Sequence, residues 1–465
     1  MDPYNDEDPD YKNTSLSSTI PIPSIDTCPK FTNNYWNRGQ NYAEPSNYRD
    51  HQLPQNQFAT PKKIELPCQN IAFLTCNFIY EEGKPIPGLE MIVGPISEPD
   101  YNQFCIKELV EGLLENKRKL SNVPRAQLTA ARGKANPYEK VGESIFINLS
   151  AMKLACLDSQ ISFTGVKRYD PVKDPVFWFA DLCGGPGGFA EYLLWRKHSC
   201  EEKVFGWGIT LTGSLDYDLD KFNPISMVKE SFESIYGEDG TGDLYKEENM
   251  KYFAEVVMDG TRGIGADLVT ADGGFDIRGQ ESHQEKLLKH LLLCQIITMF
   301  MTLKKNGVFV LKVFEIFSPF TAGLIWILYR HFERICIVKP LPSRPANSER
   351  YVICCNLKEK SPQIISYLLE VNKKFHELKT ISSSSKEPKE QQMDVNEIVK
   401  SEIMNVDEEF MDYLKTSNMK IAIKQKEGLI ELQKYIDNPD LETPDHNEYR
   451  RLCFQEWHII KNEEQ

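Results

Sequence analysis

The stretch Asp181-Leu-Cys-Gly-Gly-Pro-Gly-Gly-Phe-Ala190 determines the fold that the sequence predicts. It follows the strand-like segment Phe177-Trp-Phe-Ala180 and opens a helical stretch over 187–198. Its glycines let the backbone turn tightly and let a ligand approach without a Cβ in the way. A strand, a glycine-rich turn and a helix in this order are typical of α/β proteins that bind a ligand at the carboxyl end of a strand.

The segments that follow alternate between strand-like and helical patterns. Strand-like runs occupy 203–210, 267–271, 308–311, 334–338 and 351–355, with helical stretches over 281–304 and 319–332. Such alternation implies right-handed βαβ crossovers. The sequence therefore predicts an α/β, Rossmann-like fold, with a doubly wound, mainly parallel sheet and helical flanks. A further helix is predicted over 103–121, where apolar residues recur at helical spacing.

Composition divides the chain into three parts. Residues 1–62 are rich in Asn, Pro, Ser, Asp and Tyr, and we expect them to be mostly disordered. The folded catalytic domain is expected over 63–375, beginning with a small β-containing segment at 66–98. Residues 376–465 are expected to form a flexible break at Ser382-Ser-Ser-Ser385 and then a charged, solvated helical tail.

Charge and composition exclude several classes of protein. The 465 residues carry a net charge of −14, which argues against a general polyanion binder but allows a local basic groove. The acidic start has no basic region or apolar run typical of a secretory signal, and the apolar stretch 291–303 is shorter than the ~20 residues of a membrane helix. The 12 cysteines form no CxxC pair, so we expect no metal site, no disulfide framework and a reduced, intracellular protein.

The residues in and around the glycine-rich turn exclude several classes of ligand. No Gly-Lys-Ser/Thr follows, so a P-loop is excluded, and the spacing is not G-x-G-x-x-G. Pro186 also removes an amide donor, which disfavours a dinucleotide. Asp181, at the end of the strand, suits a ligand with a cationic amino group, such as S-adenosylmethionine (SAM). A tight turn that binds nothing is the structural alternative.

Four ionisable residues lie in or beside apolar segments: Lys153, Asp272, Lys312 and Glu349. A buried charge is costly unless it is paired, so Lys312 needs a partner, and Asp272 on the neighbouring strand is the natural one. A purely structural ion pair is the alternative. If the two lysines lie close together, burial and mutual repulsion lower their pKa values. A lysine of this kind can accept a proton from a hydroxyl group.

With these residues, the chain resembles the cap-specific mRNA (nucleoside-2′-O-)-methyltransferases of the FtsJ-like (RrmJ-like) group, in particular the branch that modifies the first transcribed nucleotide. The motifs of the group are Asp181–Phe189, Ala271-Asp-Gly-Gly-Phe275, Gly279-Gln-Glu281, Lys312 and Ser343-Arg-Pro-Ala-Asn-Ser-Glu-Arg-Tyr351. Ala190–Lys197 and Asn136-Pro-Tyr-Glu139 are characteristic of that branch. The resemblance extends from about 103 to 420.

The resemblance implies a methyl transfer from SAM to the ribose 2′-oxygen of the first nucleotide of 5′-capped RNA. It implies a catalytic tetrad of Lys153, Asp272, Lys312 and Glu349. The implied SAM-binding residues are Asn148, Asp181, Cys183, Gly184, Gly185, Pro186, Gly187, Gly188, Phe189, Asp243 and Leu244. A bland surface turn is the alternative for Asp243, which lies in Gly240-Thr-Gly-Asp-Leu244.

For the capped RNA, the resemblance points to Lys117, Arg118, Lys119, Leu120, Ser121, Arg132, Ser282, His283, Gln284 and Asn347. Independently of it, the stretch 117–140 is locally basic and could follow RNA phosphates, although a solvated basic surface is the competing interpretation. A pocket for the cationic cap base is expected to combine aromatic stacking with acidic contacts. Tyr138 and Phe275 are candidates, with ordinary core packing as the alternative.

The resemblance also implies residence in the nucleus, although no basic localisation run supports it and the cytoplasm stays open. The termini could bind transcription or RNA-processing proteins, no membrane is expected, and the oligomeric state is not predicted. Three alternatives for the function are open: a methyltransferase of the second cap-proximal nucleotide, a ribosomal RNA 2′-O-methyltransferase, and a non-catalytic cap- or RNA-binding module.

Overall fold

The computed structural model describes residues 65–67, 69–79, 86–120, 122–139, 141, 145–165, 176–214, 216–226, 228–274, 280, 283–384, 392–443 and 445–459. All of them belong to one compact unit, 63–465. The segment 1–62, for which we predicted disorder, lies outside the described residues, as do Ser121, Phe275 and Ser282.

Within the described residues, eight strands form one twisted sheet in the order β1-β8-β9-β7-β6-β3-β4-β5. The strands of the chain are β1 Leu74–Thr75, β2 Leu89–Pro95, β3 Val176–Leu182, β4 Lys203–Ile209, β5 Phe232–Ile235, β6 Ala266–Ala271, β7 Leu303–Val313, β8 Phe332–Val338, β9 Arg350–Leu357 and β10 Met393–Val399. The pairs β3–β4, β3–β6, β4–β5 and β6–β7 are parallel, whereas β1, β8 and β9 join antiparallel to their neighbours. The predicted α/β fold with a mainly parallel sheet is confirmed.

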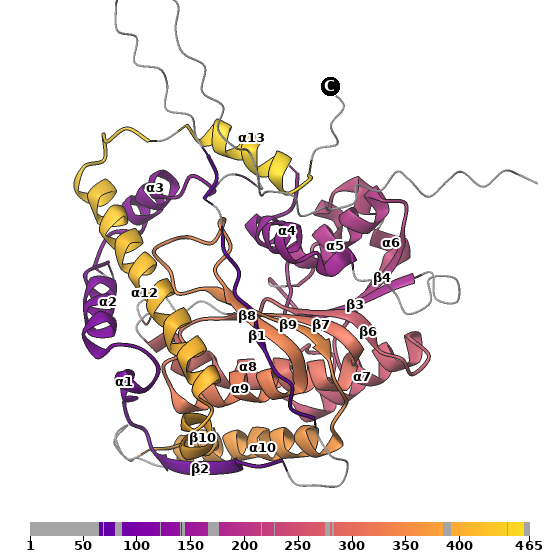
Figure 1. The fold of residues 1–465 in the computed structure, drawn as a ribbon. Coiled ribbons are helices and arrows are strands. Elements are labelled where there is room, and N and C mark those ends of the chain that lie inside the picture. The colour runs from indigo at the N-terminus through magenta and orange to yellow at the C-terminus, as the bar shows by residue number, and fades with distance from the viewer. Residues whose placement is uncertain are drawn as a thin grey trace, which may run out of the picture. The chain divides into compact units, whose positions relative to one another are not determined.

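Helices cover both faces of the sheet, with α4 to α6 on one face and α7 to α9 on the other (Figure 1). Their bounds are α1 Tyr101–Phe104, α2 Lys107–Leu120, α3 Arg125–Ala135, α4 Leu149–Ile161, α5 Gly188–Ser199, α6 Val228–Ser231, α7 Glu247–Gly260, α8 Gln284–Thr302, α9 Pro319–His331, α10 Pro362–Ser384, α11 Ser401–Asn405, α12 Glu408–Asp437 and α13 His446–Glu456. None of the described helices is long and apolar enough to span a lipid bilayer.

Local sequence explains where the helices next to the site begin. The side chain of Asn148 accepts a hydrogen bond from Ser150 N and caps α4, while Ser318 accepts one from Thr321 N and caps α9. Pro319 follows at the first position of α9, where a missing amide costs nothing. These caps fix the start of the helices that flank the carboxyl ends of the central strands.

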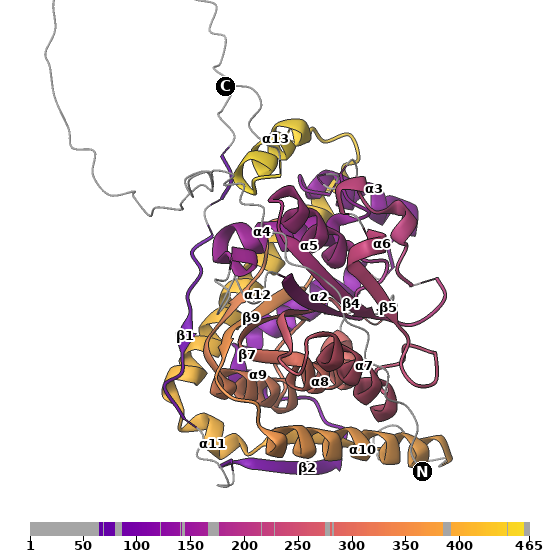
Figure 2. The ribbon, with the colours of Figure 1, turned by 90° about the vertical axis from the view of Figure 1, so that its right-hand side faces the viewer.

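The C-terminal segment is part of the same unit and does not form a separate tail. Strand β10 pairs antiparallel with β2, and α12 packs against α2 and α3. Figures 1 and 2 show β2 beside α10 at one end of the unit, with α12 running past α2. This differs from the boundary expected at 376, because one face of α12 buries apolar residues such as Phe410, Leu414 and Leu429 in long-range contacts.

The strand order places a switch point between β3 and β6. The chain runs from β3 outward to β4 and β5, then returns to the other side of β3 as β6. The loops that follow β3 and β6 therefore leave the same edge of the sheet in opposite directions, which is where open α/β sheets bind their ligands.

Candidate active site

The glycine-rich turn between β3 and α5 is built so closely that side chains would not fit. A Cβ added to Gly184 would lie 1.8 Å from Asp181 Oδ2, and one added to Gly188 would lie 2.1 Å from Asn148 Oδ1. Gly187 has a φ of 113°, and its Cβ would lie 2.3 Å from the ring of Phe222. The turn thus needs glycine at these positions, because its backbone packs directly against Asp181, Asn148 and Phe222 at the switch point.

Asp181 supports the turn from beneath. Its side chain is fully buried, with Oδ1 accepting a 2.7 Å hydrogen bond from Thr270 and Oδ2 a 3.2 Å hydrogen bond from Tyr217. Burial, opposed by these two hydrogen bonds, raises the pKa of Asp181 to about 7. The direct contact with a cationic amine that we expected for this carboxylate is therefore not what the geometry provides, because the turn itself covers it.

The other residues predicted to bind SAM divide into two groups. Asn148 lies directly against Gly188, and the loop of Asp243 lies against the end of β4, since a Cβ on Gly242 would meet Thr210 O at 1.7 Å. In contrast, the side chains of Phe189 and Leu244 are buried in the core, so only their backbone is available to a ligand. Their apolar character is explained by packing.

The four charged residues come together as two ion pairs. Lys153 on α4 places Nζ 2.8 and 2.9 Å from the two oxygens of Glu349, which immediately precedes β9. Lys312 is the penultimate residue of β7. Its Nζ lies 2.6 Å from the carbonyl oxygen of Asp272 and 3.2 Å from Oδ1 of the same residue. The predicted pairing of Lys312 with Asp272 is confirmed, and the four side chains keep exposures of 7% to 13%, so a substrate can reach them.

The two pairs influence each other's charge. Burial works to raise the pKa of Glu349, but Lys153, Lys312 and Lys339 outweigh it and lower the pKa to about 2. Burial likewise opposes the charge on Lys153, but Glu349 and Asp272 outweigh it and raise its pKa. The expectation of a lowered pKa is therefore wrong for Lys153, because Glu349 and Asp272 together outweigh burial and the repulsion from Arg344.

Two residues that we did not predict complete this cluster. Tyr351 donates a 2.9 Å hydrogen bond to Asp272 Oδ1 and lies opposite Lys312 in the β7–β9 register. Lys339 follows β8 and donates to four acceptors in the next ten residues, and burial lowers its pKa to about 7. Tyr351 belongs to a quoted motif, but only the fold reveals that Lys339 points back into its own loop.

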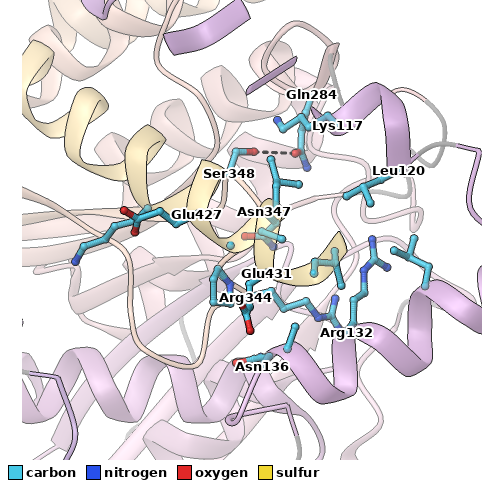
Figure 3. Close-up of a pocket in the computed structure, with 18 of the residues that line it drawn as sticks. Lys117, Leu120, Arg132, Asn136, Gln284, Arg344, Asn347, Ser348, Glu427 and Glu431 are labelled. Carbon is cyan, nitrogen blue, oxygen red and sulfur yellow. Dashed lines mark hydrogen bonds between the residues drawn. The ribbon is translucent and has the colours of Figure 1, made fainter. Parts of the chain in front are cut away.

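A cavity of about 620 Å³ is lined in part by the loop that leads to Glu349 (Figure 3). Its walls come from α2, α3, α12 and the loop between β8 and β9. The lining residues are Pro67, Lys117, Leu120, Leu128, Arg132, Ala135, Asn136, Gln284, Arg344, Pro345, Ala346, Asn347, Ser348, Lys424, Glu427, Gly428, Leu429, Glu431 and Leu432. Asn347 and Ser348 lie in the cavity wall and Glu349 is the next residue, so the cavity and the charged cluster share one loop.

Half of the residues predicted for capped RNA meet in this cavity: Lys117, Leu120, Arg132, Gln284 and Asn347. Lys117 also pairs with the buried carboxylate of Glu315. Arg118 and Lys119 are exposed on the other side of α2, and His283 lies in the wall of a different hollow. Helical geometry explains the split, because residues 117 and 120 share a face of α2 that 118 and 119 do not.

The expected aromatic stacking is not found in the described walls of the cavity. Tyr138 is buried and packs edge-on against Tyr449, with ring centroids 5.6 Å apart, so its core-packing alternative is confirmed. The walls are mainly aliphatic, with Leu120, Pro345 and Leu432 among them. Sequence reasoning missed the α12 side of the cavity, because nothing local in 408–437 indicates that it lies opposite Arg132.

The residues present fit the cofactor that this fold implies. A ligand at the switch point would meet the backbone of 183–188, whose glycines pack against Asp181, Phe222 and Asn148, and would have Asn148 and Asp243 on its flanks. In the described part of the chain no group of His, Cys, Asp or Glu could hold a metal ion.

Comparison with known proteins identifies the class of the domain. Residues 146–357 match the FtsJ-like methyltransferase family. This part of the chain is thus an FtsJ-like methyltransferase domain, which implies S-adenosylmethionine as the methyl donor.

Curated relatives are more specific and extend beyond the domain. The chain is similar to cap-specific mRNA (nucleoside-2′-O-)-methyltransferase 1 of Mus musculus, with 38% identity over 371 residues, 77% of this chain and 42% of the relative. The Homo sapiens relative of that name is 38% identical, over 77% of this chain and 43% of the relative. The Dictyostelium discoideum relative is 34% identical, over 91% of this chain and 56% of the relative. The chain spans about half the length of the curated relatives it matches.

Proposed function

We propose that this chain transfers a methyl group from S-adenosylmethionine to the ribose 2′-oxygen of the first nucleotide of 5′-capped RNA. The observation that carries the proposal is the arrangement of the two ion pairs, Lys153–Glu349 and Lys312–Asp272, at the sheet edge of the glycine-rich turn. A large cavity with basic and aliphatic walls adjoins these pairs through the loop of Asn347. The names of the relatives supply the substrate class.

In the reaction, the ribose oxygen attacks the methyl carbon in line with the bond to the sulfonium sulfur, and the 2′-hydroxyl loses its proton. When bound, SAM supplies an already activated methyl group, so most of the acceleration comes from alignment. Lys312 accepts the proton if its amine is neutral, or as an ammonium orients the hydroxyl and stabilises the charge that develops on the oxygen. Asp272, held by Tyr351, fixes Lys312, and Glu349 holds the ammonium group of Lys153 in place beside them.

On the substrate side, we place the cap in the cavity of Figure 3. The side chain of Arg132 supplies positive charge for the phosphates, and the aliphatic residues Leu120, Pro345 and Leu432 flank the base. Glu427 and Glu431 on α12 place negative charge at its rim, which suits a cationic base.

The proposal is tested with labelled SAM and three short RNAs: capped, uncapped, and capped RNA already methylated on its first nucleotide. We expect label only in the capped, unmethylated RNA. Transfer to the premethylated RNA would instead indicate the second nucleotide as the target, and transfer to uncapped RNA would indicate a ribosomal type of substrate. Absence of transfer to all three, with cap binding retained, would favour a non-catalytic module.

The nucleus is the compartment we propose, because the substrate is newly made RNA. A fluorescent fusion of the full chain should then concentrate in the nucleus, and an even distribution would contradict this. Proteins of transcription or RNA processing are proposed as partners of the termini, to be sought by crosslinking in cells.

A further inference from the structure

Lys339 has a geometry unlike that of any other described lysine in the site. Its Nζ donates to Ser343 Oγ at 3.0 Å, to the carbonyl and side-chain oxygens of Asn347 at 2.9 Å each, and to the carbonyl of Glu349 at 2.8 Å. All four acceptors lie within ten residues of Lys339, so the loop 340–349 is wrapped around its ammonium group. An ammonium offers three protons, and four acceptors at these distances use all of them.

The same loop holds the two functional parts of the site. Arg344 and Asn347 line the cavity, and Glu349 pairs with Lys153 in the charged cluster. Ser343 connects them, because its hydroxyl accepts from Lys339 and donates its own proton to Glu349 Oε1 at 2.7 Å. Asn347 Oδ1 also accepts from the amide of Glu349 at 3.2 Å.

We propose that Lys339 is a positioning residue that couples the cavity to the catalytic charges, by holding Asn347 and Glu349 in one loop conformation. It does not contact the substrate; it acts through the loop. The inference rests on the proposed function for its kinetic effects, but the loop conformation can be measured without any substrate.

The fold supports an anchor of this kind. The loop begins at the end of β8 and ends at the start of β9, which are antiparallel neighbours, so both ends are fixed by the sheet. The segment between them contains Pro340, Pro342 and Pro345, which lack amide donors and cannot form a ladder of backbone hydrogen bonds. The side chain of Lys339 supplies the donors that such a ladder would have supplied.

The test is Lys339→Met, with Lys305→Met as the matched control. Lys305 is an exposed residue of β7 paired with Glu359, and it lies seven residues from Lys312, roughly 23 Å along the strand. For Lys339→Met we expect faster amide hydrogen exchange in 340–349, a KM for capped RNA raised about tenfold or more, and a kcat lowered about tenfold or more. The affinity for SAM should stay within about twofold of the wild type, because the glycine-rich turn makes no bond to this loop. The control should match the wild type in all four quantities.

A second variant keeps the proposal testable if Lys339→Met does not fold. Ser343→Ala removes the hydroxyl that bridges Lys339 and Glu349 and leaves Asn347 bound to Lys339. It should lower kcat about tenfold with KM nearly unchanged, since the hydrogen bond to the Glu349 carboxylate is lost while Asn347 in the cavity wall keeps its two bonds to Lys339. Exchange and KM in Lys339→Met within about twofold of the wild type, or an unchanged kcat in Ser343→Ala, would overturn the proposal. A wild-type protein that does not methylate capped RNA would overturn the proposed function, while the exchange measurement would still decide the role of Lys339.

Discussion

The two halves of the site are built in different ways. The half around the glycine-rich turn uses short motifs next to strand ends, and all of its charged residues lie within the matched domain, 146–357. The half around the cavity takes most of its walls from α2, α3 and α12, which all lie outside that domain. Inside the domain, the loop between β8 and β9 and Gln284 at the start of α8 contribute. The chemistry is thus located in the common fold, and we expect the choice of RNA to be located in what surrounds it.

The sharpest contrast between the halves should come from Lys312→Ala. Loss of the group that receives or orients the 2′-proton should lower kcat about 10³-fold, while affinity for SAM and for capped RNA changes little. Single-turnover rates and titration calorimetry measure the two effects separately. A rate within a few fold of the wild type would show that Lys312 has no catalytic role.

A substitution in the glycine-rich turn should weaken the binding of SAM, which is the second function of this half of the site. Gly187→Ala adds a Cβ 2.3 Å from the ring of Phe222 at a φ of 113°, so the turn must move. We expect SAM affinity to fall more than about tenfold, as strain of about 1–3 kcal/mol is introduced. Gly263→Ala is the control, because its φ is also positive, at 79°, but nothing lies within 4 Å of the added atom. Equal losses in both variants would mean that backbone strain alone, and not the ligand surface, explains the result.

Substitutions in the cavity should weaken the binding of capped RNA and leave the rate of methyl transfer unchanged. Arg132 lines the cavity, whereas Arg118 is exposed outside it, so Arg132→Ala and Arg118→Ala form a matched pair. For Arg132→Ala we expect KM for capped RNA to rise about tenfold with kcat unchanged and with a weaker dependence on salt. Arg118→Ala should change KM less than about twofold. A larger effect for Arg118 would place the RNA on the opposite face of α2.

The smallest expected effect concerns stability at low pH. The pKa of Glu349 is lowered from its ordinary 4.5 to about 2, so its carboxylate stabilises the folded state above pH 4.5, and this contribution is lost as the pH falls toward 2. The melting temperature of the wild type should therefore exceed that of Glu349→Gln at pH 6, and the gap should narrow below pH 4.5. The exposed Glu402→Gln should show a small gap at every pH. If the difference in melting temperature between the wild type and Glu349→Gln is the same at pH 6 and pH 3, the ion pair is contradicted.

The sequence was sufficient for the half that depends on local pattern. Most strands and helices from β3 to β9 could be predicted because their apolar runs and glycine-rich turn are contiguous, although β5 and the helices α6 and α7 beside it were missed. Lys312 and Asp272 could be paired because a buried lysine at a strand end requires a nearby carboxylate.

The cavity half could not be predicted in this way. Lys117 meets Glu315 across 198 residues, and α12 reaches the cavity only because Phe410 and Leu414 pack into the core. In the sequence, the many Glu and Lys residues of α12 favour the interpretation of a solvated helix, so its buried apolar face was not predicted. Lys339 was missed because its role depends on a loop conformation. The aromatic cap pocket was expected from a general rule, and the described walls of the cavity contain no aromatic residue, while Phe275 lies outside the described residues.

The most direct test of the central claim is mass spectrometry of the cap itself. A short capped RNA is incubated with the wild-type chain and SAM, then digested to its cap dinucleotide. The account predicts one added methyl group, on the ribose of the first nucleotide, and none when Lys312 is replaced by Ala. A methyl group on a base or on another nucleotide, or equal methylation by the Lys312→Ala variant, would contradict it.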